Sequence, residues 1–212
     1  MNDTTKNKTR GRSEEKRQQI IDAASHLFTE QGFLSTSMDQ VAETAGVSKQ
    51  TVYSHFGTKD DLFKFCIENR CIASALNEDI FVDTLPVKTV LMAFAHHFQE
   101  LILSREAIQL CRLCATNAEL HPEISDMFFS AGPAQVESSL QNYLTKQNRL
   151  GNIQCDNIAI AADQLLCILK GSAHFKALLG LPNQDCLDAI DQYLEKSVDM
   201  FLHFYPPKPQ SS

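Results

Sequence analysis

The sequence from residue 37 to residue 59 reads SMDQVAETAGVSKQTVYSHFGTK. Ser37 is followed three residues later by Gln40, which is the spacing of a capping box and predicts the start of a short helix. Gly46 predicts the end of that helix and a tight turn, after which Ser48 can cap a second short helix. Two short helices joined by a glycine turn are typical of a helix-turn-helix, whose second helix enters the major groove of DNA.

The second predicted helix, residues 49–56, has one apolar and one polar face. Val52 and Phe56 lie four residues apart and are expected to hold the helix against the protein. At its N-terminus, glutamine can pair with adenine and lysine with guanine. Lys59 opens the next helix, where its ammonium and the free N–H groups are expected to bind one phosphate. Tyr53 and His55 lie further along the helix and can donate to phosphate oxygens, although His55 could instead be a satisfied interior histidine. The predicted DNA contacts are therefore Lys49, Gln50, Thr51, Tyr53, His55 and Lys59.

Outward from this stretch, the chain is predicted to be all-α, with about nine to ten helices. Residues 14–31 repeat apolar side chains with helical period, and no segment shows sustained alternation. A fourth helix is predicted over residues 59–80. Later helices are predicted at 86–104, 105–119, 122–131, 133–149, 156–179 and 184–205, before a frayed tail.

The net charge of −7 is unevenly distributed. Residues 1–70 hold ten Lys or Arg and ten Asp or Glu, whereas residues 71–212 hold nine and sixteen. Salt screens charges beyond ~10 Å. The acidic second part therefore does not exclude nucleic-acid binding by the first part, which begins with a basic arm.

Composition favours an ordinary globular protein, with 43% hydrophobic and 21% charged residues. The uninterrupted apolar runs fall short of the ~20 residues that span a bilayer. The first residues lack the apolar core of a secretory signal. We therefore expect a cytoplasmic protein with no membrane partner.

The seven cysteines and the histidines do not form a recognisable metal or cofactor motif. Cys111 and Cys114 have the C-x-x-C spacing, but no second pair or suitably spaced histidine accompanies them. His96 and His97 are adjacent and point about 100° apart on a helix. We expect no metal and no cofactor, and thiols that behave as small hydrophobic groups.

The stretch from residue 11 to residue 63 resembles the TetR family of transcription regulators. The resemblance implies a dimer that reads a palindromic operator, with DNA contacts from Ser37 and Ser48 as well. Gln50 departs from the family pattern, in which glycine is common, so its role in base preference is open. The matching residues are Ala23-Ala24-x-x-Leu27-Phe28, Gly32-Phe33, Ser37-Met38-x-x-Val41-Ala42, Ala45-Gly46-Val47-Ser48 and Val52-Tyr53-x-His55-Phe56-x-x-Lys59-x-x-Leu62.

Residues 113–180 resemble, less closely, the C-terminal domain of AefR-like members of that family. The features that carry this resemblance are His121-Pro122-Glu123-Ile124, Phe128-x-x-Ala131-Gly132-Pro133 and Leu169-Lys170-Gly171. The expected organisation is a flexible basic arm (1–12), a helix-turn-helix domain (13–58), a connecting helix (59–80), a ligand-binding and dimerisation domain (81–205) and a tail (206–212).

The predicted helices at 156–179 and 184–205 are apolar on more than one face, so either the chain's own core or a partner must bury them. The resemblance implies a four-helix bundle with a second copy across a two-fold axis. A thick monomeric core is the alternative. The expected interface residues are Leu165, Leu169, Leu187, Ile190, Leu194 and Phe201.

A pocket for a largely apolar small molecule is expected between the central helices. Each candidate for its lining could instead be an ordinary core residue. The candidates are Phe94, Phe98, Cys114, Asn117, Phe129, Gln164 and His174.

The leading interpretation is a repressor that a small molecule releases from DNA, for which a differential affinity of ~1–3 kcal/mol suffices. A thiol-based redox regulator that switches through Cys111 and Cys114 is the second, although residues three apart on one helix can be bridged only with distortion. An enzyme is the third, and it lacks a catalytic triad, a phosphate loop, paired carboxylates or a metal motif. We therefore expect no enzymatic activity.

Overall fold

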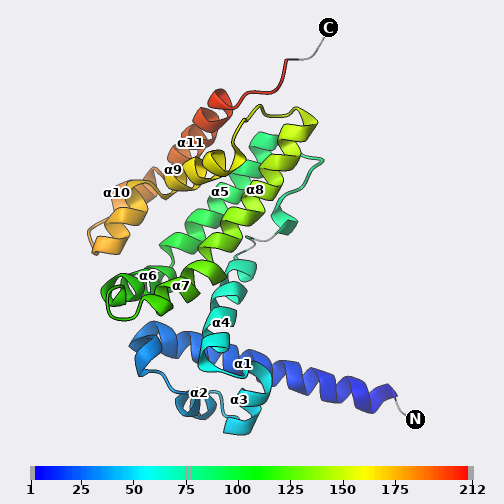
Figure 1. Ribbon diagram of the computed structural model, residues 1–212, viewed down its shortest axis with the longest axis vertical. Helices are drawn as coiled ribbons and strands as arrows, with labels where there is room; N and C mark the ends of the chain where they lie inside the picture. Colours follow the sequence, from blue (N-terminus) through cyan, green and yellow to red (C-terminus); the bar gives the residue numbers. More distant parts are fainter. Residues whose placement is uncertain (1–2, 75, 77, 210–212) are drawn as a thin grey trace. The chain divides into compact units, whose positions relative to one another are not determined.

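The computed structural model describes residues 3–74, 76 and 78–209, without the side chains of residues 3–12 and 78. Within these residues every secondary-structure element is a helix, which confirms the all-α prediction (Figure 1). The helices are α1 (Asp3–Ser35), α2 (Met38–Thr44), α3 (Lys49–Phe56), α4 (Lys59–Ala73), α5 (Val87–Leu103), α6 (Arg105–Asn117), α7 (Pro122–Ala131), α8 (Pro133–Leu150), α9 (Ile158–Leu179), α10 (Gln184–Asp188) and α11 (Ile190–Phe204), with a short 3-10 turn at Glu78–Ile80.

The chain folds as two compact units. Unit 1 comprises Met1–Asn69 and Leu113–Ala131, and unit 2 comprises Arg70–Arg112 and Gly132–Ser212. Residues 113–131 therefore fold with the N-terminal helices, whereas the sequence groups them with the later ones. α1 begins at Asp3, earlier than the predicted residue 14, so residues 3–12 of the expected flexible arm are helical. The side chains of that basic arm lie outside the described residues.

An aromatic cluster forms the core of unit 1. The rings of Phe28 and Phe63 meet edge to face with their centroids 5.1 Å apart, and Phe33 lies 5.0 Å from Phe63. Gly32 has a φ of 83°, so helical geometry stops there before Phe33 turns into the cluster. An added Cβ at Gly32 would lie 2.9 Å from Leu113 Cδ1, which places the Leu113 side chain directly on the main chain of α1.

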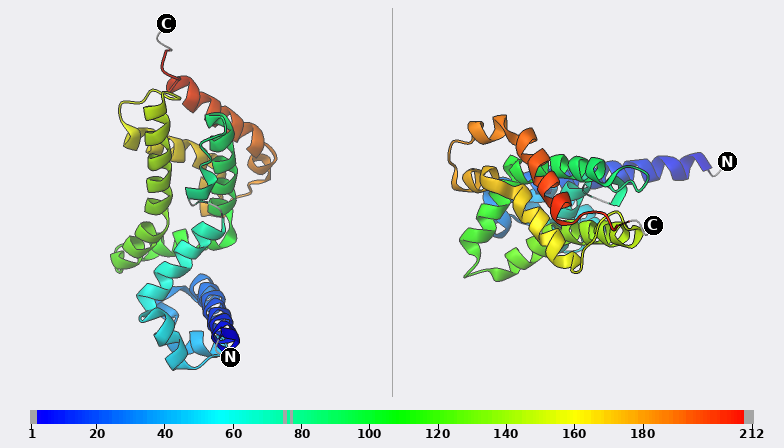
Figure 2. Two further views of the ribbon diagram at one scale, coloured as in Figure 1. Left: turned by 90° about the vertical axis from the view of Figure 1, so that its right-hand side faces the viewer. Right: turned by 90° about the horizontal axis from the view of Figure 1, so that it is seen from above.

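Unit 2 is a helical bundle. α9 packs against α5 and α8, and α11 packs against α5 and α9 (Figure 2). Their facing sides contribute fully buried residues such as Leu91, Leu140 and Leu165. α9 is the one described helix that is long and apolar enough to cross a membrane, but a core helix passes the same test. Here its inward face belongs to the core of unit 2.

Two of the predicted helices are interrupted. α9 breaks at Gly171, which has a φ of 53°, and the predicted helix 184–205 divides at Ala189 into α10 and α11. Tyr193 lies against Gly171, where an added Cβ would come within 2.8 Å of its hydroxyl oxygen. The break in α9 therefore accompanies a tertiary contact that the helical period of the sequence does not reveal.

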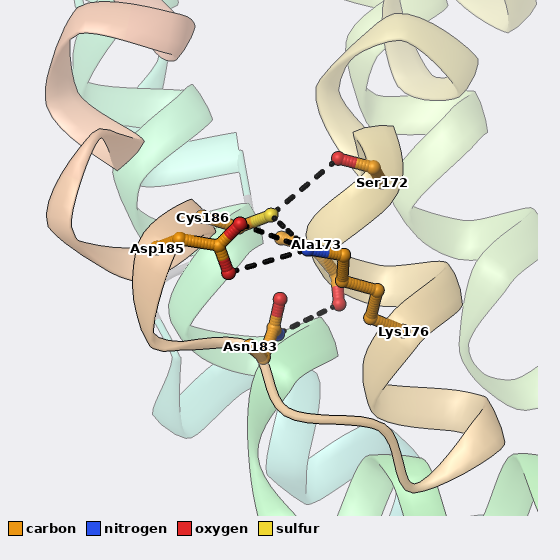
Figure 3. A network of polar contacts seen from close by, with 6 residues as sticks. All are labelled: Ser172, Ala173, Lys176, Asn183, Asp185 and Cys186. Carbon is orange, nitrogen blue, oxygen red and sulfur yellow. Dashed lines mark hydrogen bonds and ion pairs between the residues drawn. The ribbon is translucent and has the colours of Figure 1, made fainter.

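Polar contacts tie α10 back to α9 (Figure 3). The Lys176 ammonium donates to both carboxylate oxygens of Asp185, at 3.1 and 3.2 Å, and lies 3.3 Å from the Cys186 Sγ. The Asn183 amide donates to the Ala173 carbonyl oxygen at 2.9 Å. These contacts hold the short helix in place although none of its own residues is buried.

Candidate nucleic-acid interface

The two short helices α2 and α3 have the predicted caps. The Gln40 N–H donates to Ser37 Oγ at 3.2 Å, and the Ser37 N–H donates to Gln40 Oε1 at 2.8 Å. Gly46 makes the turn with a φ of 65°. Ser48 Oγ then accepts from the Thr51 N–H at 3.2 Å and starts α3. The predicted capping box and turn are therefore confirmed.

α3 has the predicted buried and exposed faces. Val52 is 0% exposed and Phe56 is 7% exposed, so both anchor the helix in unit 1. The other side chains are exposed or half-buried, and Tyr53 has 45% of its surface exposed. The half-buried residues are Thr51 and His55, and the exposed ones are Lys49, Gln50, Tyr53 and Ser54.

Arg17 of α1 supports α3 in a way that the sequence does not reveal. Its guanidinium lies over the ring of Phe65, 4.1 Å from the centroid, and 5.5 Å from the centroid of Phe56. A guanidinium stacks favourably on aromatic rings at these distances. The sequence identifies Arg17 only as one of several basic residues near the N-terminus, because the pattern of α1 alone does not show which face meets α4.

Lys59 does not have the environment expected of an outward-facing phosphate ligand. Its ammonium donates to the carbonyl oxygens of Phe33 at 2.9 Å and Thr36 at 3.0 Å, and lies 4.2 Å from the Phe33 ring centroid. Burial lowers the pKa of this half-buried lysine. The side chain fastens the end of α1 to the start of α4. The phosphate contact expected at the start of α4 stays a prediction.

Lys49 forms an ion pair across the turn. Its Nζ lies 2.6 Å from Oδ1 and 2.9 Å from Oδ2 of Asp39 in α2. The hydrogen bond and the charge of Asp39 raise the pKa of Lys49, which keeps it protonated. The outward ammonium at the N-terminus of α3 therefore has a local carboxylate partner.

The expected pocket residues lie in both units. Phe94 and Phe98 stack in the core of unit 2, with ring centroids 5.9 Å apart. Cys114, Asn117 and Phe129 belong to unit 1, where Phe129 is 56% exposed.

The other two expected pocket residues lie on α9. Gln164 is exposed and accepts from the Tyr205 hydroxyl at 2.8 Å. His174 is half-buried, and burial, followed by the charge of Lys170, lowers its pKa. An open pocket of about 470 Å³ on unit 2 does not include either residue and is lined by Gln154, Asp156, Asn157, Ile160, Phe204, Tyr205 and Pro206.

Sequence reasoning misses the buried polar groups of unit 2, among them Gln99 and Tyr143. Gln99 Oε1 and the Tyr143 hydroxyl have no hydrogen-bond partner among the described residues. Burial raises the pKa of Tyr143, so its hydroxyl stays protonated. Phe81 stacks on Tyr143 at 4.7 Å and on Phe94 at 5.6 Å. A glutamine or a tyrosine among the apolar residues of a helix gives no signal of its own in the sequence. Whether its polar atom finds a hydrogen-bond partner depends on the folded core.

Most of the expected interface residues are interior. Leu165, Leu169 and Leu194 are 0% exposed and Phe201 is 3% exposed, because they face the core of unit 2. Ile190 is half-buried and Leu187 is exposed. α9 and α11 nevertheless carry a second set of exposed apolar side chains. These are Ile160, Phe175 and Leu179 on α9 and Tyr193, Met200 and Phe204 on α11.

The cysteines are all free thiols. Cys114 is buried, and burial raises the pKa of Cys111, which lowers the fraction of reactive thiolate. The described residues contain no group of three His, Cys, Asp or Glu that could hold a metal ion. No feature of these residues favours the redox interpretation over the DNA-binding one.

Comparisons with known proteins agree with this geometry. Residues 20–65 match the tetR family of bacterial regulatory proteins, and residues 89–207 match the C-terminal domain of AefR-like transcriptional repressors. The Escherichia coli repressor ComR is 25% identical over 171 residues, which cover 77% of this chain and 81% of ComR. AcrR of Shigella flexneri is 46% identical over 56 residues, and the chain covers only 26% of its length.

Solved structures show the same fold along almost the whole chain. A TetR-family regulator from Mesorhizobium loti has a TM-score of 0.74 at 27% identity, with 92% of this chain and 98% of that chain covered. The flavonoid-responsive regulator FrrA has a TM-score of 0.72 at 28% identity, with the same coverage of both chains.

Proposed function

Because the chain belongs to the TetR family of DNA-binding transcriptional regulators, we propose that it is a repressor that binds a palindromic operator as a homodimer and is released by a small molecule. The observation that carries the proposal is α3, which is anchored by Val52 and Phe56 and exposes its polar face. Membership of a family of transcriptional regulators gives no support for catalysis, so we propose no enzymatic role. We propose a cytoplasmic location for the same reason.

The proposed DNA contacts follow the exposed face of α3 and the caps beside it. Gln50 reads a base edge, because its exposed amide can pair bidentately with adenine. Tyr53 and His55 contact phosphates and fix the register of the helix. Ser37 and Ser48 also cap α2 and α3, and the Thr51 hydroxyl lies 2.8 Å from Ser48 Oγ, so their contribution to DNA is made alongside those bonds.

The proposed dimer uses the exposed apolar side chains of α9 and α11. Met200 is 53% exposed and Phe204 is 72% exposed, on the same helix as the buried Leu194 and Phe201. Met200 and Phe204 lie four residues apart on α11 and therefore share one face, and such an exposed apolar face supports association with a second copy. A two-fold pair would present two copies of α3 to two half-sites, as a palindromic operator requires.

The proposed ligand is largely apolar and carries hydrogen-bonding groups. Gln99 Oε1 needs a donor, and the Tyr143 hydroxyl can donate or accept. Leaving such groups unpaired in a core costs about 1–3 kcal/mol each, so a molecule that pairs with them gains affinity. The stacked rings of Phe81, Tyr143 and Phe94 suit an aromatic compound. The flavonoid-responsive character of FrrA supports this class.

The experiment is a titration of the protein with a DNA duplex from the region that flanks its own gene and contains an inverted repeat. Fluorescence anisotropy is measured between about 50 and 200 mM salt, where phosphate contacts are strongly salt-dependent. The control duplex has the same length and composition with one half-site scrambled. We expect tight, salt-dependent binding to the repeat as a dimer. Equal affinity for both duplexes would argue against sequence-specific recognition.

A further inference from the structure

Asp39 of α2 and Lys49 of α3 form an exposed ion pair in the helix-turn-helix. Lys49 Nζ lies within 2.9 Å of both carboxylate oxygens of Asp39. The two side chains are 64% and 58% exposed, so solvent and DNA can reach either partner. The ammonium also lies 5.9 Å from the ring centroid of Tyr53, one of the proposed phosphate contacts.

The other charged residues between 37 and 59 determine how much this ion pair contributes to the charge of the outer face. The segment contains two lysines, Lys49 and Lys59, and two acids, Asp39 and Glu43. The Lys59 ammonium is engaged with main-chain oxygens of α1 and the adjoining turn. Lys49 is therefore the lysine of this segment that remains on the outer face, and Asp39 balances its charge.

We propose that Asp39 sets how strongly the protein is attracted to DNA of any sequence, by competing with phosphate oxygens for the Lys49 ammonium. This inference rests on the proposed DNA-binding function and adds a residue to it. A lysine that is held by a carboxylate contributes less to binding, because its contact with DNA is gained only when the existing ion pair is given up. The carboxylate of Asp39 therefore weakens binding through Lys49, beyond any direct repulsion of the phosphates.

Four proteins test this inference on a duplex of random sequence at low salt: wild type, Asp39→Asn, Lys49→Met and the double variant. Because exposed ion pairs contribute at most ~1 kcal/mol, we expect Asp39→Asn to tighten binding by about three- to fivefold. The slope of log K against log salt should steepen by up to about 0.9, which corresponds to one additional phosphate contact. In the Lys49→Met background, the same substitution should change the affinity less than about twofold.

Glu43→Gln is the matched control. Glu43 is an exposed acid of the same short helix, with no ion pair in the described part of the chain, so its removal changes the net charge equally. Circular dichroism and thermal unfolding show whether each variant keeps the fold. All of the substituted side chains are exposed, so we expect the fold to be kept.

The outcomes separate the inference from the function on which it rests. Equal effects of Asp39→Asn and Glu43→Gln would show that only net charge matters. A full effect of Asp39→Asn in the Lys49→Met background would show direct repulsion by Asp39. Either result overturns the inference while DNA binding stands. If wild type binds neither random DNA nor the inverted repeat at low salt, the proposed function itself fails.

Discussion

The hydroxyl of Tyr193 donates a hydrogen bond to the main-chain oxygen of Ile168, at 2.6 Å, beside the break in α9. A second group, the buried Gln99 amide, donates to the neighbouring Leu169 oxygen. Residues 168 and 169 lie just before Gly171, where the helix cannot continue its own pattern. The break is therefore stabilised from α5 and α11, which satisfy carbonyl groups close to it.

Gly171→Ala should destabilise unit 2. The positive φ is unfavourable for alanine, and the new Cβ would lie 2.8 Å from the Tyr193 hydroxyl oxygen. We expect a loss of about 1–3 kcal/mol in the free energy of unfolding, measured with urea. The same substitution in a Tyr193→Ala background is the control, because the backbone term is unchanged and the side chain that the new Cβ would meet is absent. Equal losses in the two backgrounds would show that Tyr193 adds no steric term.

Lys59→Met should destabilise unit 1. The substitution keeps an apolar stem but leaves the Thr36 oxygen without its lysine donor and removes the ammonium from the Phe33 ring. Because this site is half-buried, we expect a loss of about 1–2 kcal/mol in unfolding free energy. Lys64→Met removes the same charge from the same helix and should cost less than about 0.5 kcal/mol. A Lys59→Met protein as stable as wild type would contradict the fastening role.

Gln50→Ala and Tyr53→Phe should affect DNA binding differently. The Gln50 amide is proposed to read a base, so its loss should weaken binding to the operator by about 1–3 kcal/mol and leave random DNA nearly unchanged. Loss of the Tyr53 hydroxyl would remove a proposed phosphate contact and should weaken binding to the operator and to random DNA by a similar factor. Anisotropy titrations on the two duplexes measure this. Equal losses on both duplexes for Gln50→Ala would mean that Gln50 reads no base.

Met200→Glu should convert the proposed dimer into a monomer. A charge at this exposed position is tolerated in one subunit but is unfavourable once a partner covers it. Sedimentation velocity at micromolar concentration measures the result. Leu85→Glu, at a position that is 47% exposed on the segment before α5, is the control and should leave the mass unchanged. A dimeric Met200→Glu protein would place the interface elsewhere.

Stability should fall in alkali through Cys66. Burial raises the pKa of its thiol from 9.0 to about 11. The unfolded thiol ionises first, so the stabilising contribution is complete below pH 9 and is lost as the pH rises to 11. This loss should be about 2 kcal/mol in wild type. Cys66→Ala should show a shallower decline over that range, whereas Cys167→Ala, at an exposed position, should follow wild type.

The local features of unit 1 could be predicted from sequence because they depend on neighbours in the chain. The capping box at Ser37 and the buried spacing of Val52 and Phe56 are properties of three or four residues. The environments of Lys59 and Arg17 could not be predicted, because each depends on a residue of another helix. The burial of Leu165, Leu169 and Leu194 in the subunit's own core could not be predicted for a related reason, since helical period identifies an apolar face but not whether the subunit's core or a partner covers it.

Unit 1 is assembled from two separate stretches of the chain, and this limits how the protein can be divided. A fragment that ends near Asn69 would lack Leu113–Ala131 and would leave bare the main chain of α1 at Gly32, where Leu113 packs. Such a fragment would be prone to aggregate, and a weak affinity measured with it would reflect an incomplete fold. Limited proteolysis within α4 should likewise leave the two products associated, since residues 113–131 would still pack with the N-terminal helices.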